Sequence, residues 1–252
     1  MFMEQIRKRL TMNHTTDQLL NCLVVGTPGA GKTYNYVIPN IKAGYASYVV
    51  YDVDGMIHRQ THSILTSKDY DVLSFDFSKD DPYAIDMTDL CSRLGRKKTA
   101  VFVIHSCLSF NDTSCSSKEA QFLEKLITIL TLNCMASDSK SLEVPVEFYF
   151  DDFCNMPPLK DLDKVLVECR DYNINFNIIS MGLPQLEEYC EKCCDFSAVD
   201  LNCGCDMFVQ IGHRLPKDII DILFRDPTDV KDGQVLVAYK DGTHFVDDIY
   251  KV

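Results

Sequence analysis

The chain has 252 residues, of which 46% are hydrophobic and 25% are charged, and its formal net charge is −12. This apolar content is enough for one large domain with a core on both sides of a sheet. The acidic balance counts against a protein that coats nucleic acid by itself, because such binding needs a broad basic surface.

Short apolar runs alternate with longer amphipathic stretches along the chain. We expect strands at residues 20–25, 48–51, 71–75, 100–104, 147–150, 176–179, 207–211 and 234–239. We expect helices at residues 32–38, 55–65, 118–133, 159–172, 185–194 and 217–224, and loops at 111–117 and 136–143. The strands are nearly continuous apolar runs, which is typical of a parallel sheet covered on both faces. Their alternation with helices predicts a doubly wound α/β architecture.

Residues 26–33 read Gly-Thr-Pro-Gly-Ala-Gly-Lys-Thr, between the first apolar strand and a helix that we expect to stop near Pro39. Three glycines let backbone N–H groups approach a polyphosphate closely, and the helix that follows points its positive end at the anion. Lys32 is placed to reach the outer phosphates and the Thr33 hydroxyl to bind Mg²⁺. The residues expected to bind nucleotide are Gly26, Thr27, Pro28, Gly29, Ala30, Gly31, Lys32, Thr33 and Tyr34.

The second half of such a site is a carboxylate at the end of a buried strand. Residues 147–152 read Glu-Phe-Tyr-Phe-Asp-Asp and end an apolar run in two acids. Asp151 would hold Mg²⁺ and Asp152 would orient the attacking water. Taken alone, the pair also fits a solvated acidic turn, and it is the loop at 26–33 that favours the functional interpretation.

Eight segments of the chain, in this order, match the motifs of one family. They are 21–33, 37–40, 47–52, 148–157, 162–166, 169–170, 184–188 and 205–212. With these segments the chain resembles the TraG-type coupling ATPases of bacterial conjugation and type IV secretion. The resemblance runs from about residue 10 to the C-terminus and is far more specific than the phosphate-binding loop alone.

The resemblance implies a RecA-like P-loop NTPase that uses ATP and Mg²⁺, with residues 1–252 forming a single domain. In the family, a hexameric ring docks relaxosome substrates, and ATP turnover drives their export through a membrane channel. By position, Lys32 and Thr33 match the phosphate and Mg²⁺ ligands and Asp151 the Mg²⁺-side carboxylate. Arg170 matches an arginine directed at a neighbour's nucleotide, although a solvated charge near a helix end is an equal alternative.

Three departures from the family fall at positions that we expect to matter for hydrolysis. The usual Asp-Glu pair is Asp151-Asp152 here, so the base is one methylene shorter. A family glutamine that senses the γ-phosphate falls at Met181, whose thioether cannot donate a hydrogen bond. An Asp-Pro-Lys-Gly-Glu segment appears as Asp-Val-Asp-Gly-Met at 52–56, with a charge reversal at Asp54. The binding loop is intact, so we expect nucleotide binding with slow or absent hydrolysis.

The family's N-terminal membrane helices and its large helical insertion are also expected to be absent. No run of about 18 apolar residues is present, and residues 1–17 lack the apolar centre of a signal peptide. We therefore expect a bacterial, cytoplasmic protein that meets a membrane only through its partners. Its partners would be copies of itself or a full-length coupling protein in a ring, and the relaxosome or other secretion components.

Three functions remain open at this stage. The first is an ATPase that supports transfer of DNA or nucleoprotein. The second is a catalytically weakened module that binds ATP and regulates or joins rings, so enzymatic activity itself is uncertain. The third is a nucleic-acid translocase of the FtsK–HerA class, against which the acidic balance and the missing insertion count. Direct nucleic-acid binding is accordingly expected to be weak or absent.

The chain has 12 cysteines and no signal peptide, which is typical of reduced thiols in a cytosol. Five of them lie close together in sequence, at Cys190, Cys193, Cys194, Cys203 and Cys205. Zinc, with His213 as a further ligand, and the packing of small apolar side chains are both open for this cluster, whose spacing fits no zinc template.

Overall fold

The computed structural model describes residues 21–81, 84–105, 113–136, 142–203, 205–209, 234–239 and 244–248. Its strands are β1 (Cys22–Val25), β2 (Ser47–Asp52), β3 (Asp71–Phe75), β4 (Thr99–Ile104), β5 (Val146–Phe150), β6 (Ile174–Ser180), β7 (Cys205–Val209), β8 (Gln234–Tyr239) and β9 (His244–Asp248). They form a nine-stranded sheet in the order β3-β4-β2-β5-β6-β1-β7-β8-β9. Every neighbouring pair from β3 across to β7 is parallel, and the pairs β7–β8 and β8–β9 are antiparallel.

The predicted α/β class with a mostly parallel sheet is confirmed. All eight expected strands are present, with ends shifted by at most two residues within the described ranges. Residues 210–211 of the seventh lie outside those ranges, and β9 was not expected. The single-domain assignment for residues 1–252 stays a prediction.

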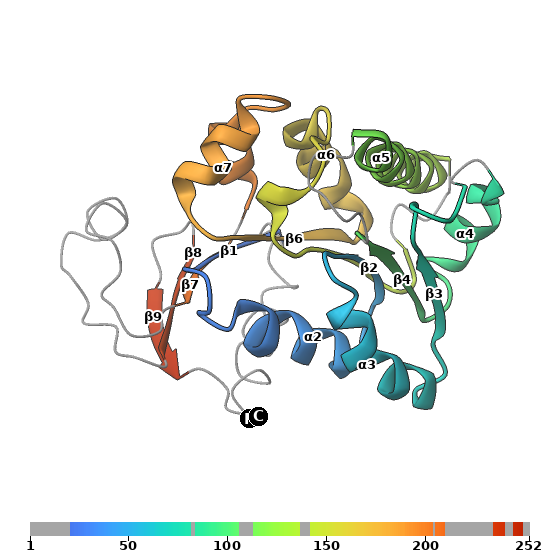
Figure 1. Cartoon of the computed structure of the whole chain (residues 1–252), viewed down its shortest axis with the longest axis horizontal. Helices are drawn as coiled ribbons and strands as arrows, with labels where there is room; N and C mark the ends of the chain where they lie inside the picture. The colour runs from blue at the N-terminus through green and yellow to red at the C-terminus, as the bar shows by residue number, and fades with distance from the viewer. Residues whose placement is uncertain are drawn as a thin grey trace.

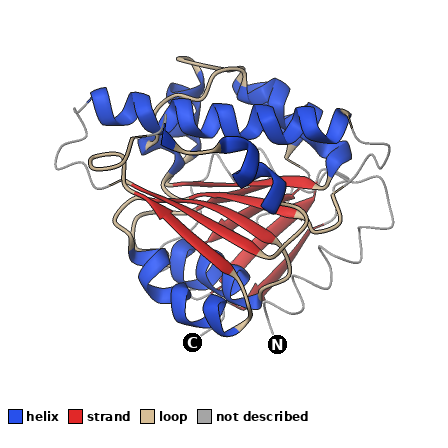
Figure 2. Cartoon of the chain, turned by 90° about the vertical axis from the view of Figure 1, so that its right-hand side faces the viewer, coloured by secondary structure: helices blue, strands red, loops and turns tan. Residues whose placement is uncertain are grey.

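The helices cover both faces of the sheet (Figures 1 and 2). They are the π-helix η2 (Thr33–Val37), α2 (Ile38–Ala43), α3 (Met56–Ser67), α4 (Met87–Arg93), α5 (Thr113–Met135), α6 (Leu162–Glu168), α7 (Leu183–Cys190) and α8 (Phe196–Asn202), with 3₁₀ turns η4 (Phe153–Asn155) and η5 (Cys169–Tyr172). The expected helix at 217–224 lies outside the described residues. None of the described helices combines the length and apolar character needed to cross a membrane.

One predicted helix end is wrong. The helix after the loop does not stop at Pro39 but continues through α2 to Ala43, where Gly44 caps it in the left-handed region at φ 70°. The π-helix η2 precedes Pro39, and Ile38 N–H bonds back five residues to Thr33 O. The proline therefore falls in the first turn of α2, where its missing N–H costs least.

Other differences concern helix lengths. The helix α5 begins at Thr113, so the loop expected at 111–117 is wrong from residue 113 onward. Serine and threonine at 113–117 are weak helix formers, but the long apolar stripe that follows them overrides this local preference. The helices α4 and α8 were not expected, and the helix expected at 159–172 is divided between α6 and η5.

Two apolar cores pack on opposite sides of the sheet. The core that we call the α5 face lies beneath α4, α5, α6 and α7 and contains the phenylalanines Phe122, Phe148, Phe150, Phe153 and Phe176. The core that we call the α2 face lies beneath η2, α2 and α3 and contains Tyr36, Tyr48, Tyr70 and Tyr149. Figure 1 shows the two helical layers with the sheet between them.

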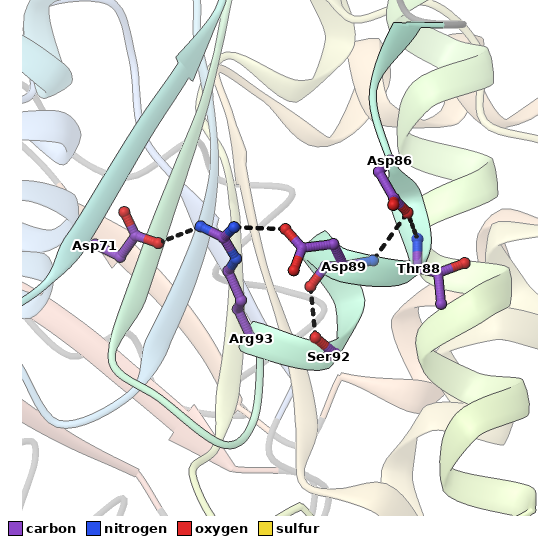
Figure 3. A network of polar contacts seen from close by, with 6 residues as sticks. All are labelled: Asp71, Asp86, Thr88, Asp89, Ser92 and Arg93. Carbon is purple, nitrogen blue, oxygen red and sulfur yellow. Dashed lines mark hydrogen bonds and ion pairs between the residues drawn. The ribbon is translucent and has the colours of Figure 1, made fainter.

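A polar network caps the start of α4 and links its last residue to the edge strand β3 (Figure 3). Asp86 caps α4 by accepting hydrogen bonds from Thr88 N–H and Asp89 N–H, both at 3.0 Å. Arg93 bridges Asp71 at 2.7 Å and Asp89 at 2.5 Å. The side chains are exposed, so each ion pair adds little to the stability of the fold.

Candidate nucleotide site

The loop of residues 26–31 connects β1 to η2 at the carboxyl end of the parallel strands. Gly29 and Gly31 have φ values of 80° and 78°, which side chains with a Cβ rarely adopt. Space is not the constraint at Gly29, because a Cβ there would meet nothing within 4 Å. Gly26 N–H donates to Ser180 O at 3.2 Å, which ties the loop to the end of β6.

Lys32 is folded against its own loop. Its Nζ donates to Gly26 O at 2.6 Å and to Thr27 O at 3.2 Å, and the residue is only 6% exposed. Burial lowers the pKa of Lys32, and the nearby carboxylates of Asp152 and Asp151 act in the opposite direction. The ammonium is thus buried, hydrogen-bonded and close to both acids.

Thr33 and Asp151 meet directly, although 118 residues separate them. The Thr33 hydroxyl lies 2.9 Å and 3.1 Å from the two carboxylate oxygens of Asp151, to which it donates. Burial, and then the charge of Asp152, raises the pKa of Asp151 to about 7. The end of β5 therefore brings a buried carboxylate to the first helical residue after the loop.

Of the other predicted site residues, Asp152, Tyr34 and Met181 lie at the same end of the sheet as this pair, whereas Arg170 precedes β6 and lies at the other end. Asp152 adopts a left-handed conformation at φ 48° and starts the turn η4. Tyr34 is 52% exposed on the first turn of η2, and Met181 is half-buried just after β6. The backbone of Arg170 lies in η5, and its side chain is outside the described part of the structure.

One residue of this edge was not assigned a role from the sequence. Asp52 ends β2, the neighbour of β5, and is 1% exposed. A signal was available, because Asp52 follows a buried strand just as Asp151 does. Which strands are neighbours in the sheet, however, does not follow from their order along the chain.

The described residues do not support a zinc site. Sγ atoms of Cys193 and Cys194 lie 3.7 Å apart, and burial raises the pKa of Cys193 to about 12. Within the described ranges, no group of three or more His, Cys, Asp or Glu side chains could hold a metal ion. The side chain of Cys205, and His213, lie outside those ranges. The described cysteines of the cluster are free thiols that are buried or half-buried, which favours the packing interpretation.

The same finding is compatible with Mg²⁺. This ion is usually held by one or two protein oxygens together with phosphates and water, and not by an all-protein cage. The Thr33 hydroxyl and the buried Asp151 carboxylate are a pair of protein oxygens of that kind, and Lys32 close by can bind phosphate.

A family model described as type IV secretory system conjugative DNA transfer matches residues 89–200. No curated protein sequence matches the chain significantly. Solved structures match with low sequence identity, so their likeness concerns the fold.

One of these structures is the bacterial conjugative coupling protein TrwBdeltaN70, with 9% identity, a TM-score of 0.58, and coverage of 91% of this chain and 85% of that one. Another is the genome packaging NTPase B204 of Sulfolobus turreted icosahedral virus 2 in complex with ATP-gammaS, with 15% identity, a TM-score of 0.54, and coverage of 93% and 100%. A third is VirB4 of Thermoanaerobacter pseudethanolicus, with 11% identity, a TM-score of 0.51, and coverage of 93% and 90%.

The fold is that of P-loop NTPases. Over residues 89–200 the chain is thus similar to the conjugative DNA transfer family, and it shares its fold with a conjugative coupling protein and with VirB4.

Proposed function

We propose that this protein binds ATP with Mg²⁺ and hydrolyses it, slowly, to support the transfer of DNA or nucleoprotein. The observation that carries the proposal is the meeting of Thr33 with Asp151 beside Lys32, at the end of a glycine loop with two left-handed positions. The family match and the likeness to coupling proteins support the transfer role.

The chain's own groups divide the work. Backbone N–H groups of the loop and the Lys32 ammonium bind phosphate oxygens, after the ammonium leaves the two loop carbonyls that it now contacts. The Thr33 hydroxyl and the Asp151 carboxylate would hold the metal, which would neutralise charge on the phosphates when bound. The exposed ring of Tyr34 lies on the same turn and is available to contact the nucleoside.

Hydrolysis depends on the groups around the outer phosphate. Asp152 takes the role of orienting the attacking water, and Arg170 acts on the nucleotide of a neighbouring copy in a ring. An arginine of that kind can change the rate by about 10³–10⁵. Because Asp152 is one methylene shorter than a glutamate, the alternative of an ATP-binding, ring-joining module without transport activity also stays open.

Lys32→Ala tests the proposal. Nucleotide affinity should fall at least tenfold, and Mg²⁺-dependent phosphate release should fall to background, because the main cation for the phosphates is lost. Thermal melting with and without Mg–ATP, together with a phosphate-release assay, checks both. Ligand at about 100-fold above Kd should stabilise the wild-type protein by about 2.7 kcal/mol.

The exposed Lys164, which pairs with Asp161 on α6, offers a matched control. Lys164→Ala should leave binding and turnover unchanged. Equal nucleotide affinity in the wild-type protein and in Lys32→Ala would end the proposal, since it would mean that the loop does not hold the phosphates.

Asp152→Glu separates the enzyme from the binding module. If turnover is limited by the reach of the base, the added methylene should raise kcat severalfold, up to about 100-fold, with little change in ATP affinity. Steady-state turnover at saturating Mg–ATP is the measurement, repeated across protein concentrations so that a contribution from a neighbouring copy is visible. An unchanged kcat would place the deficit elsewhere, for example at Met181.

A further inference from the structure

Asp52 is a buried acid at the end of β2, and its carboxylate is hydrogen-bonded to the start of α3. Its carboxylate accepts hydrogen bonds from His58 N–H at 2.8 Å and from Ile57 N–H at 3.2 Å, at the start of α3. The N-cap residue, Gly55, has no side chain to cap the helix, so Asp52 satisfies these donors instead. Arg59, on the next turn, is directed to Asp54 O at 2.9 Å.

The strand register places Asp52 beside Asp151. The strands β2 and β5 are parallel neighbours, and Tyr51 pairs with Phe150, so Asp52 and Asp151 follow at the same level. The residues two positions earlier, Val50 and Tyr149, both belong to the α2 face. Side chains alternate along strands, and neighbouring strands lie about 4.8 Å apart. The two carboxylates therefore occupy the same face of the sheet at the same height.

The two acids also interact electrically. The negative charge of Asp52 is one of the causes that raise the pKa of Asp151. Burial raises the pKa of Asp52 itself, the hydrogen bonds from α3 oppose that rise, and Asp54 and Arg59 make smaller, opposite contributions. A pair of buried, neighbouring carboxylates favours any cation that arrives between them and the phosphates.

We propose that Asp52 is a further positioning residue of the nucleotide site, which adds its negative charge to that of Asp151 in holding the divalent cation. This inference rests on the proposed function. Asp52 acts through water, because its oxygens already accept two backbone N–H groups and because Mg²⁺ usually keeps several of its waters. The cation site is thereby linked to the first turn of α3.

Asp52→Asn is the central test, because it removes the charge and keeps one of the two oxygens that accept hydrogen bonds from α3. The probes are a fluorescent ATP analogue, titrated with and without Mg²⁺, and Mn²⁺ followed by its magnetic resonance signal. The Mg²⁺ concentration for half-maximal effect should rise roughly tenfold, as expected for one charge lost near a divalent ion. Metal-free nucleotide affinity should rise or stay unchanged, because a negative charge near the triphosphate is gone.

A higher Mg²⁺ requirement without a loss of metal-free affinity distinguishes the loss of a charge near the cation from damage to the fold. If Asp52 only supported the fold, both the metal-free and the metal-dependent affinity would fall together. Asp54→Asn is the matched control, because Asp54 is exposed, lies two residues away and caps Met56 N–H at 2.8 Å. It should shift the Mg²⁺ requirement less than twofold.

The possible failures are distinguishable. A wild-type protein whose nucleotide binding does not respond to Mg²⁺ would contradict the proposed function. A wild-type protein that responds, with an unchanged Mg²⁺ requirement in Asp52→Asn, would overturn this inference alone. Should Asp52→Asn fail to fold, Asp52→Ser supplies a second neutral cap, and the same tenfold shift is expected of it.

Discussion

The two faces of the sheet are built from different chemistry. On the α5 face, phenylalanine rings predominate and pack against one another, as where Phe148 and Phe176 stack with ring centroids 4.8 Å apart. Tyr51 and Tyr189 also belong to this face, and their hydroxyls donate to Glu119 and to Pro157 O. On the α2 face, the rings carry hydroxyls that form directed bonds. Tyr36 OH donates to Asn177 Oδ1 at 2.5 Å, and Asn177 Nδ2 donates to Glu147 Oε2 at 2.8 Å.

The difference coincides with what each face supports. The α2 face carries η2 and α2, the helical segment that begins after the glycine loop of residues 26–31. Burial is nondirectional, so it gives stability but only loosely defines the rotation of a helix. Hydrogen bonds are directional, and those of Tyr36 fix the turn that presents Thr33 to Asp151. We therefore expect the α5 face to govern stability and the α2 face to govern the geometry of the site.

The largest expected effect is on the α5 face. Phe176 is fully buried, so Phe176→Ala should lower the free energy of unfolding by about 3–5 kcal/mol. Nucleotide affinity of the protein that remains folded should be unchanged. Urea unfolding and nucleotide titration at low temperature measure the two quantities, and a loss of affinity equal to the loss of stability would remove the proposed division between the faces.

A smaller change in stability, this time an increase, is expected when the Asp151 carboxylate is replaced. The pKa of Asp151 is raised from 3.8 to about 7 in the folded protein. Between about pH 4 and pH 7 the folded state holds the proton that the unfolded state has lost, so stability falls as pH rises, and above pH 7 the full loss remains.

Asp151→Asn removes the ionisable group and therefore the loss of stability that its raised pKa causes at neutral pH. The variant should be more stable than the wild-type protein by up to about 4 kcal/mol at pH 8, with the difference shrinking towards zero near pH 4. Its response to Mg²⁺ should disappear at the same time. Urea unfolding at several pH values is the measurement, and a stability difference that does not depend on pH would show that Asp151 is ionised in the folded state much as it is in water.

The smallest expected change in stability comes from Tyr36, which lies in η2 shortly after the glycine loop. Tyr36→Phe keeps the ring but leaves Asn177 Oδ1 without its donor, which should cost about 1–3 kcal/mol of stability. Nucleotide affinity should fall severalfold, beyond what the lost stability alone explains, because the rotation of η2 is less well defined. Calorimetric titration of Mg–ATP tests this, with Tyr70→Phe as the matched control, since Tyr70 OH donates to Ala46 O on the same face but away from η2. Equal changes in the two variants would argue against a special role for Tyr36.

The parts that local chemistry determines were predictable from the sequence. The loop at 26–33 uses residue types that few other structures require, and the continuous apolar strands were located to within two residues. Asp151 was predicted because the apolar run at 147–150 ends in two acids, and the structure places it beside Thr33.

The parts that depend on contacts between distant segments were not predictable. Helix continuation through Pro39 requires the π-helix η2, and that helix is held by Tyr36 against Asn177, 141 residues away. Likewise, the nearness of Asp52 and Asp151 depends on β2 lying next to β5, with two strands intervening in the chain. Neither relation leaves a periodic or compositional signal.

The position of Lys32 has a consequence for the energetics of ligand capture. Its ammonium has already been dehydrated and anchored to Gly26 O and Thr27 O during folding. A phosphate that recruits it exchanges one set of oxygen acceptors for another and does not strip water from a freely hydrated cation. The protein thus meets part of the cost of recognition before any ligand arrives, which is preorganisation at the level of a single side chain.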